Sequence, residues 1–410
     1  MKRRRVVVVF GSLDTKGSDV LFVRDLIARA GYTPVVVDTG VLGEPEFEPD
    51  VPASVVAEMG GASLNELRQK KDKTLAMRVM AEGAAMVARK LYEEGKLDAV
   101  LALGGSSGTA VGTAAMRALP LGIPKVMVST LAAGNTAPYV GTKDVCMIHS
   151  VVDVAGVNSI SAQIYSNAVG AIIGMLEMEP PKIAVRPLVV ASMFGNTTKA
   201  VSYAKTILEQ HGYEVLVFHA TGTGGRIMES LIAEGRVVGV LDITTTELAD
   251  EVVGGVLSAG PERLDAAAAA GVPQVVAPGC LDMVNFWGKD SIPEKFAGRL
   301  FYEWNPNVTL MRTTPEENTV IGKLIAEKLN RAKGPVAVFL PLRGLSMLDA
   351  PGKEFWWPEA DKALFEAIKQ GLRPDIPVYE IDANINDEVF AKAVAEKLLE
   401  FLGVKNRVNS

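Results

Sequence analysis

Short, unbroken runs of Val, Ile and Leu recur along the whole chain, and most end at Gly, Ser, Thr or Asp. In the first half they cover residues 6–10, 34–37, 99–103 and 125–128. In the second half they cover residues 188–191, 215–218, 238–241, 274–276, 336–340 and 378–381. Because polar and apolar residues do not alternate within the runs, they predict strands buried on both faces, as in a parallel sheet between helices.

Stretches with helical periodicity separate these runs. Apolar residues recur with a period near 3.6 over residues 18–30, 73–92, 197–210 and 386–402. Strands that alternate with helices of crossover length predict an α/β chain with doubly wound, mostly parallel sheets.

A domain boundary is expected near residue 180. Residues 153–179 predict one long helix, and Pro180 and Pro181 stop it because proline lacks the amide hydrogen and clashes with the preceding turn. Both halves begin alike, with a strand, a short loop rich in Gly, Ser and Thr, and a helix. We therefore expect two related domains of the mononucleotide-binding type, residues 1–180 and 181–410.

The composition excludes several classes of protein. With 48% hydrophobic and 22% charged residues among 410, the chain is typical of a folded globular protein. A net charge of −6 provides no basic surface for DNA or RNA. The two cysteines, Cys146 and Cys280, rule out a disulfide framework and favour the cytoplasm. We find no run of about 18 apolar residues that would predict a membrane span.

Small and hydroxyl-bearing residues follow the strands of the first half. In a doubly wound sheet, ligands bind beyond the carboxyl ends of the strands, and free amides at helix starts attract anions. The candidate cofactor-binding residues are Gly11, Ser12, Asp14, Thr15, Lys16, Gly104, Gly105, Ser106, Ser107, Gly108, Thr109, Ser129 and Thr130. Asp38, at the end of the second strand, is placed to accept from ribose hydroxyls or to cap a helix or turn. The alternative for the loops is a set of tight turns and helix caps.

Charged residues follow the strands of the second half. Asp242, Glu247 and Asp282 are the candidates for a general base or for holding Mg²⁺, and the identity of any metal ligand stays open between these interpretations. The candidates for binding a small anionic metabolite are His219, Arg226, Arg343 and Lys353. Taken singly, each of these residues is better explained as a helix cap or a salt-bridge partner, whereas their shared position at strand ends favours a site. Cys280 is expected to be a buried, inert thiol.

Eight ordered stretches, spread over almost the whole chain, resemble one family. They are residues 11–17 (GSLDTKG), 103–109 (LGGSSGT), 139–144 (YVGTKD), 150–156 (SVVDVAG), 218–226 (FHATGTGGR), 241–247 (LDITTTE), 281–286 (LDMVNF) and 348–353 (LDAPGK). Together they resemble the UPF0261 family, the Tm-1-like ATP-binding proteins. The resemblance implies two Rossmann-like halves, ATP in the first half, and a dimer. Mg²⁺ would be the cation to accompany ATP, and the widely apolar helix expected over residues 153–179 suits a homodimer interface.

Three functions compete at this point. The first is an ATP-binding protein that acts as an enzyme on a small anionic metabolite. The second is a non-catalytic module in which ATP favours one conformation and a partner protein reads that state. The third, an NAD-dependent oxidoreductase, is disfavoured because no Gly-x-Gly-x-x-Gly follows the first strand. The loop after that strand is not a Walker A motif either, since its order is Lys-Gly-Ser.

Overall fold

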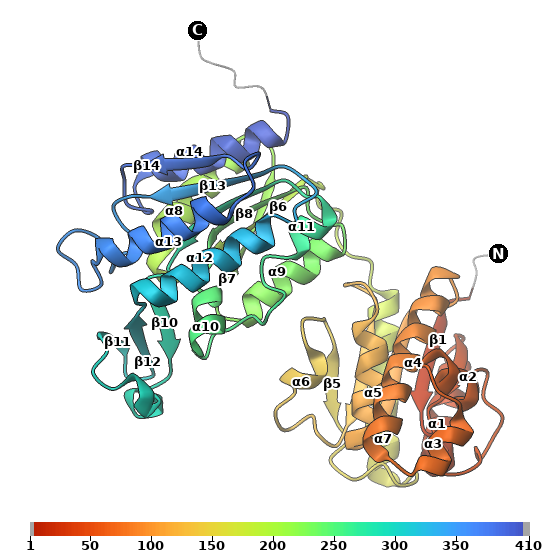
Figure 1. Cartoon of the computed structure of the whole chain (residues 1–410). Helices are drawn as coiled ribbons and strands as arrows, with labels where there is room; N and C mark the ends of the chain where they lie inside the picture. Colours follow the sequence, from red (N-terminus) through yellow and green to blue (C-terminus); the bar gives the residue numbers. More distant parts are fainter. Residues whose placement is uncertain (1–3, 405–410) are drawn as a thin grey trace. The chain divides into compact units, whose positions relative to one another are not determined.

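The computed structural model describes residues 4–404, which form two compact units that divide between Lys182 and Ile183 (Figure 1). Unit 1 carries the first half of the chain and unit 2 the second half. Both are built on parallel sheets covered by helices, which confirms the predicted doubly wound α/β fold.

Unit 1 has a five-stranded parallel sheet with the strand order β2-β1-β3-β4-β5. Its strands are β1 (Val6–Gly11), β2 (Thr33–Asp38), β3 (Ala99–Gly104), β4 (Lys125–Ser129) and β5 (Cys146–His149). Its helices are α1 (Leu13–Arg29), α2 (Ala53–Met59), α3 (Leu64–Lys70), α4 (Lys73–Glu93), α5 (Ser106–Arg117), α6 (Ala137–Val140) and α7 (Ser159–Glu177).

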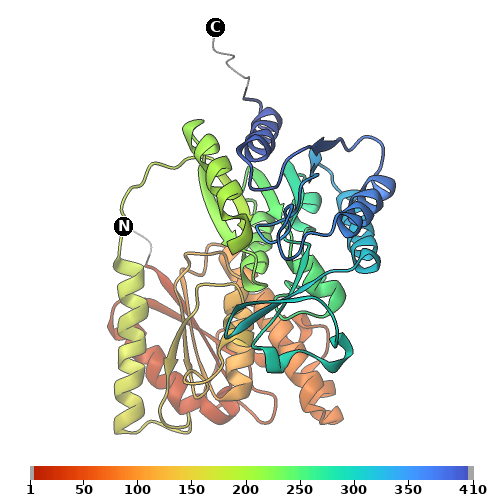
Figure 2. The same ribbon diagram turned by 90° about the vertical axis from the view of Figure 1, so that its left-hand side faces the viewer.

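Helices cover both faces of this sheet (Figure 2). Alternate residues of the strands pack against α1 and α7 on one face, with Val9, Leu101, Val20 and Tyr165 in one core. The residues between them face α2, α4 and α5 in a second core. Two-sided burial explains why the strands read as continuous apolar runs.

Unit 2 has a six-stranded parallel sheet with the order β14-β13-β9-β8-β6-β7. Its strands are β6 (Leu188–Met193), β7 (Glu214–His219), β8 (Gly239–Thr244), β9 (Gln274–Gly279), β13 (Val336–Pro341) and β14 (Val378–Ile381). Counted from β6, the order is 2-1-3-4-5-6, so both units share the arrangement 2-1-3-4-5.

Helices also cover both faces of the sheet of unit 2. They are α8 (Thr198–Gln210), α9 (Thr223–Ala233), α10 (Glu247–Val253), α11 (Ala266–Ala270), α12 (Pro315–Leu329), α13 (Pro358–Gly371) and α14 (Glu388–Phe401). Helices α8 and α14 share one apolar core with the sheet, while α10, α12 and α13 share another.

A small antiparallel sheet in unit 2 was not predicted from the sequence. It has the order β10-β12-β11, with β10 (Met283–Phe286), β11 (Phe301–Asn305) and β12 (Val308–Arg312), and is drawn in teal in Figure 1. Its β10 is buried throughout, whereas β11 is largely exposed. These strands lack the uniform apolar runs that marked the parallel strands.

Two predicted helix boundaries were wrong. Helix α1 begins at Leu13 rather than Ser18, so much of the predicted first loop is the first turn of the helix. Helix α7 begins at Ser159, not Asp153, because Asn158 caps it by accepting from the amides of Ile160 and Ser161.

Helix α7 is also less enclosed than predicted. Tyr165, Ala168 and Ile172 face the sheet, but Ile160 and Met175 are exposed. By length and apolar composition alone, α7 meets the criterion for a membrane-spanning helix, which the core helix of a soluble protein also meets.

Candidate functional site

A pocket of about 690 Å³ lies within unit 1. Its lining residues are Ser12, Asp14, Thr15, Thr39, Val41, Leu42, Leu67, Arg68, Lys71, Asp72, Lys73, Ala76, Met77 and Ser107. The strand order of unit 1 reverses between β1 and β3. Ser12 follows β1 and Ser107 stands in the first turn of α5, just after β3. The pocket therefore lies at the switch point where doubly wound sheets bind ligands.

Four predicted cofactor-binding residues line this pocket: Ser12, Asp14, Thr15 and Ser107. Ser12 and Thr15 belong to the start of α1, and Ser107 belongs to the start of α5. The first amides of a helix lack partners within the helix, so the start of α5, with the Ser107 hydroxyl beside it, suits an anion, whereas the first amide of α1, that of Leu13, already donates to Asp38.

The glycines of the predicted loops serve the backbone. A Cβ added at Gly104 would lie 2.6 Å from the Cα atom of Gly108, and one added at Gly11 would lie 2.4 Å from Val20 Cγ2. Gly105 is the N-cap of α5, and Ser106 is its first residue. Lys16 lies at a kink within α1. Close packing of strand and helix thus accounts for Gly11, Gly104 and Gly108.

Asp38, Thr109 and Ser129 have partners within unit 1. Asp38 is 3% exposed, and its Oδ1 accepts from the amides of Leu13 and Gly40. The hydroxyl groups of Thr109 and Ser129 lie 2.6 Å apart, both buried. The Thr130 amide donates to the Gly104 carbonyl. These contacts bind neighbouring strand-end loops together, and none of these side chains lines the pocket.

The apolar wall of the pocket was missed by sequence reasoning. Val41 and Leu42 belong to the loop after β2, Leu67 to α3, and Ala76 and Met77 to the start of α4. Helix α3 and the loop after β2 were not predicted. Residues 73–92 were predicted as a helix, but no sequence signal joined Ala76 and Met77 to Ser12 and Ser107. Basic residues Arg68, Lys71 and Lys73 accompany this wall.

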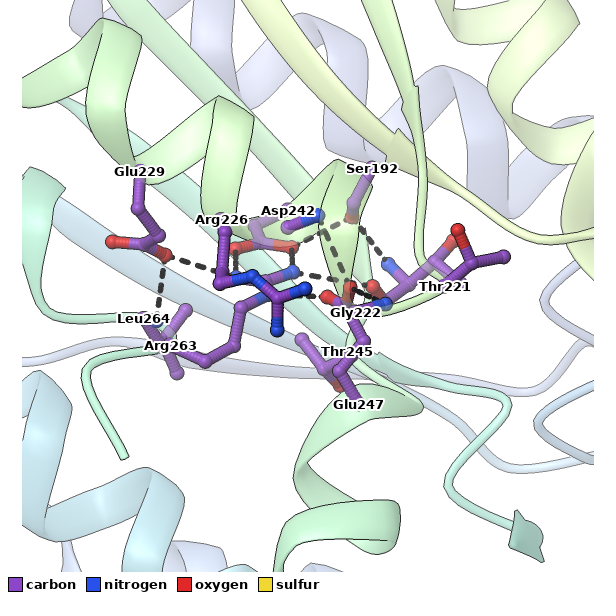
Figure 3. A network of polar contacts seen from close by, with 12 residues as sticks. Ser192, Thr221, Gly222, Arg226, Glu229, Asp242, Thr245, Glu247, Arg263 and Leu264 are labelled. Atoms are coloured by element: carbon purple, nitrogen blue, oxygen red, sulfur yellow. Dashed lines mark hydrogen bonds and ion pairs between the residues drawn. The ribbon is translucent and has the colours of Figure 1, made fainter. Parts of the chain in front are cut away.

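In unit 2, a buried ion-pair network occupies the corresponding edge of the sheet (Figure 3). Arg263 is 1% exposed and uses all five of its N–H groups. It donates to Asp242, Glu247, Glu229 and the carbonyl of Thr244. Sequence reasoning missed Arg263 because it lies in a loop, far along the chain from its partners.

Both candidate bases in this network have their oxygens engaged by the chain. Asp242 Oδ1 also accepts from Ser192, and Glu247 Oε1 accepts from the amides of Gly222 and Gly225. A Cβ added at Gly225 would lie 2.3 Å from Glu247 Oε2, which explains the glycine. The contacts give Asp242 and Glu247 a structural role and do not favour catalysis by them.

Asp282 belongs to a second buried network. Its Oδ2 accepts from the Ser346 hydroxyl, and Arg312 pairs with the neighbouring Asp349 and Asp361. Burial, together with the charge of Asp349, raises the pKa of Asp282 to about 7. Asp282 is 0% exposed. The residues predicted as a set of bases therefore divide between two networks.

The predicted anion-binding residues of unit 2 lie at its surface. Arg226 donates to the Ser258 carbonyl and to Thr223, and Figure 3 shows it near the Arg263 network. Arg343 pairs with Asp382, with both side chains more than half exposed. His219 and Lys353 are exposed. Two cavities of unit 2 lie elsewhere, beside α13 and beside α10 and α12.

Cys280 is completely buried, and burial raises the pKa of its thiol well above the usual value, as expected of an inert thiol. Among residues 4–404, no group of three or more His, Cys, Asp or Glu side chains is arranged to hold a metal ion.

Two units with the same central strand order define a two-unit protein of the doubly wound α/β class. The chain belongs to the UPF0261 family. Residues 5–181 match the model described as "Uncharacterised protein family (UPF0261) N-terminal domain", and residues 186–402 match that of the C-terminal domain.

The sequences of several relatives match most of this chain. A "UPF0261 protein" of Clostridium tetani is 52% identical over 398 residues, which cover 97% of this chain and 98% of the relative. The "ToMV resistance protein Tm-1(GCR237)" of Solanum lycopersicum is 44% identical over 334 residues, 80% of this chain but 44% of that protein. The solved structure of a UDP-N-acetylglucosamine 2-epimerase from Rickettsia bellii matches 98% of this chain and 96% of its own chain, at 12% identity and a TM-score of 0.24.

Proposed function

We propose that this protein binds ATP in the pocket of unit 1. The observation that carries the proposal is the meeting of Ser12, Thr15 and Ser107 at the switch point of the sheet, opposite an apolar wall. The hydroxyl groups and the start of α5 suit the phosphates, and the apolar wall suits a base. A volume of about 690 Å³ lies within the usual range of small-molecule sites.

Unit 2 supports this choice of site by contrast. The switch point of unit 2 lies between β6 and β8. There the Ser192 hydroxyl and Arg263 both donate hydrogen bonds to Asp242. A phosphate placed there would meet Asp242, Glu247 and Glu229, three carboxylates that face one arginine. Mg²⁺ would reach the unit 1 site mainly through phosphate oxygens and water, its usual mode with nucleotides.

Calorimetric titration with ATP tests the pocket with a matched pair of variants. Ser107 lines the pocket, whereas Ser106, its exposed neighbour in the same helical turn, does not. We expect Ser107→Tyr to weaken ATP binding at least tenfold, because the ring fills space needed by the phosphates. Ser106→Tyr should bind ATP within about twofold of the parent chain. Equal affinities in both variants would place ATP elsewhere.

Of the two functional classes, a binding module fits better than an acid–base enzyme. Asp242 and Glu247 are engaged by Arg263, and Asp282 is buried in a separate network. The surface positions of Arg226, Arg343 and Lys353 do not support a site for a small anionic metabolite. A thermal-shift panel tests for such a site: we expect ATP to raise the melting temperature and sugar acids to leave it unchanged.

We further propose a cytoplasmic homodimer. Ile160, Met175 and Met178, on and just after α7, are 51%, 40% and 75% exposed, so an apolar part of this helix is left for a second copy. The two cysteines are unpaired, as is usual in a reducing compartment. Light scattering at micromolar concentration should report twice the mass of the 43.6 kDa chain. A monomer with and without ATP would refute the dimer.

A further inference from the structure

An exposed leucine stands at the edge of the unit 1 pocket. Leu42 lines the pocket and is 86% exposed, the largest exposure of any leucine among the described residues. Its neighbours in the apolar wall, Leu67 and Met77, are buried and half-buried. When a ligand covers an apolar side chain that is otherwise exposed to water, the burial of apolar surface lowers the free energy of the complex.

The loop that carries Leu42, residues 39–44, is fastened by two side chains from different helices. Asp14 of α1 accepts from the amides of Leu42 and Gly43 through its Oδ2. Arg68 of α3 donates to the carbonyls of Val41 and Gly43. Both fastening residues also line the pocket. A ligand in the pocket therefore touches the groups that set the position of the loop.

The present position of the loop leaves one polar atom without a partner. Asp14 Oδ1 is buried and has no hydrogen-bond partner among the described residues, and it lies 2.6 Å from where a Cβ on Gly40 would stand. A buried oxygen without a partner costs free energy. A shift of the loop that lets water or a ligand donate a hydrogen bond to Asp14 Oδ1 therefore removes this free-energy cost.

Apolar side chains decide which part of a nucleotide the loop faces. A triphosphate is strongly hydrated and is better placed at the start of α5, beside the Ser107 hydroxyl. The base, which carries no charge, is then the part that lies against Leu42, Leu67 and Met77.

We propose that residues 39–44 form a movable cover and that Leu42 closes on the base of the nucleotide. This inference rests on the proposed ATP binding and assigns the two ends of the pocket. The base lies between the cover and the apolar wall from α3 and α4, and the phosphates lie at Ser12, Thr15 and Ser107.

Calorimetry on the full chain with two ligands tests the assignment. ATP carries a base, whereas inorganic tripolyphosphate carries only the charged part. Leu42→Ser should weaken ATP binding about tenfold, because the base loses its apolar cover, and should leave tripolyphosphate affinity unchanged. Met86→Ser is the matched control, since Met86 is 50% exposed on α4 and does not line the pocket. It should change neither affinity.

Each other outcome contradicts the proposal in a distinguishable way. Unchanged ATP affinity in Leu42→Ser would remove Leu42 from the base. An equal loss for both ligands would place the phosphates, not the base, under the cover. Failure of the parent chain to bind ATP would refute the proposed function itself.

Hydrogen exchange tests the movement separately from the contact. Saturating ATP should slow exchange of the Leu42 and Gly43 amides at least several-fold in the parent chain. Exchange that is unchanged on ATP binding would show that the loop does not close.

Discussion

At the scale of single residues, Arg263 makes the most consequential contacts in unit 2. It is buried with Asp242 and Glu247, whose side chains are at most 2% exposed, and it also reaches Glu229. Burying charge is expensive unless each group is paired, so the network is stable only as a whole. The oxygens of Asp242 and Glu247 are held by Arg263, Ser192 and backbone amides, which gives both side chains a part in holding the fold.

Removal of Arg263 should therefore be severe. We expect Arg263→Met to lower the free energy of unfolding by about 3–5 kcal/mol, because three carboxylates lose their shared cation. Arg343→Met is the control, since Arg343 pairs with Asp382 at the surface, where solvent screens the pair and its loss changes stability little. Urea denaturation measures both variants. A loss below about 1 kcal/mol in Arg263→Met would mean that the network does not hold unit 2 together.

At the scale of elements, Asp250 joins α10 to β10. Its carboxylate accepts from the amide of Asn285, from the Asn285 side chain and from the amide of Leu257. Burial raises the pKa of Asp250 to about 7. The folded state therefore holds a proton that the unfolded chain releases near pH 4.

This raised pKa makes stability depend on pH. Between about pH 4 and pH 7 the folded state binds more protons than the unfolded chain, so the free energy of unfolding falls as pH rises. Asp250→Asn should remove up to about 4 kcal/mol of that fall. Asn285 Oδ1 is buried without a partner, so a rotated Asn285 amide accepts from the new side chain. Denaturation from pH 4.5 to 8 measures the difference, and parallel profiles for parent and variant would contradict it.

The elements also show how far the sequence could be interpreted. The buried parallel strands were predictable because burial on two faces demands unbroken apolar runs, as in β1 and β3. The parallel strand β5 was missed, because it lies at the edge of its sheet and none of its residues is fully buried. The antiparallel β11 was not, since FYEWN mixes exposed and half-buried residues and its pairing with β12 depends on contacts made in space. Helix α1 starts earlier than predicted because Asp38, 25 residues away from Leu13, accepts the amide of Leu13 and helps to fix the helix start.

At the scale of the whole molecule, two units share one strand order but use its switch point differently. In unit 1 a pocket opens there, whereas in unit 2 an ion-pair network closes it. The sequence suggested both sites from small and charged residues after strands. The sequence could not show which of the two switch points is open, because a free carboxylate and a carboxylate paired with a distant arginine have the same local sequence.

The crystal structure of the full chain grown with saturating ATP tests the central claim most directly. We predict the triphosphate within hydrogen-bonding distance of Ser12, Thr15 or Ser107, and the base between Leu42 and Met77. A nucleotide found outside the unit 1 pocket, or no nucleotide at a concentration far above the calorimetric Kd, would contradict the account.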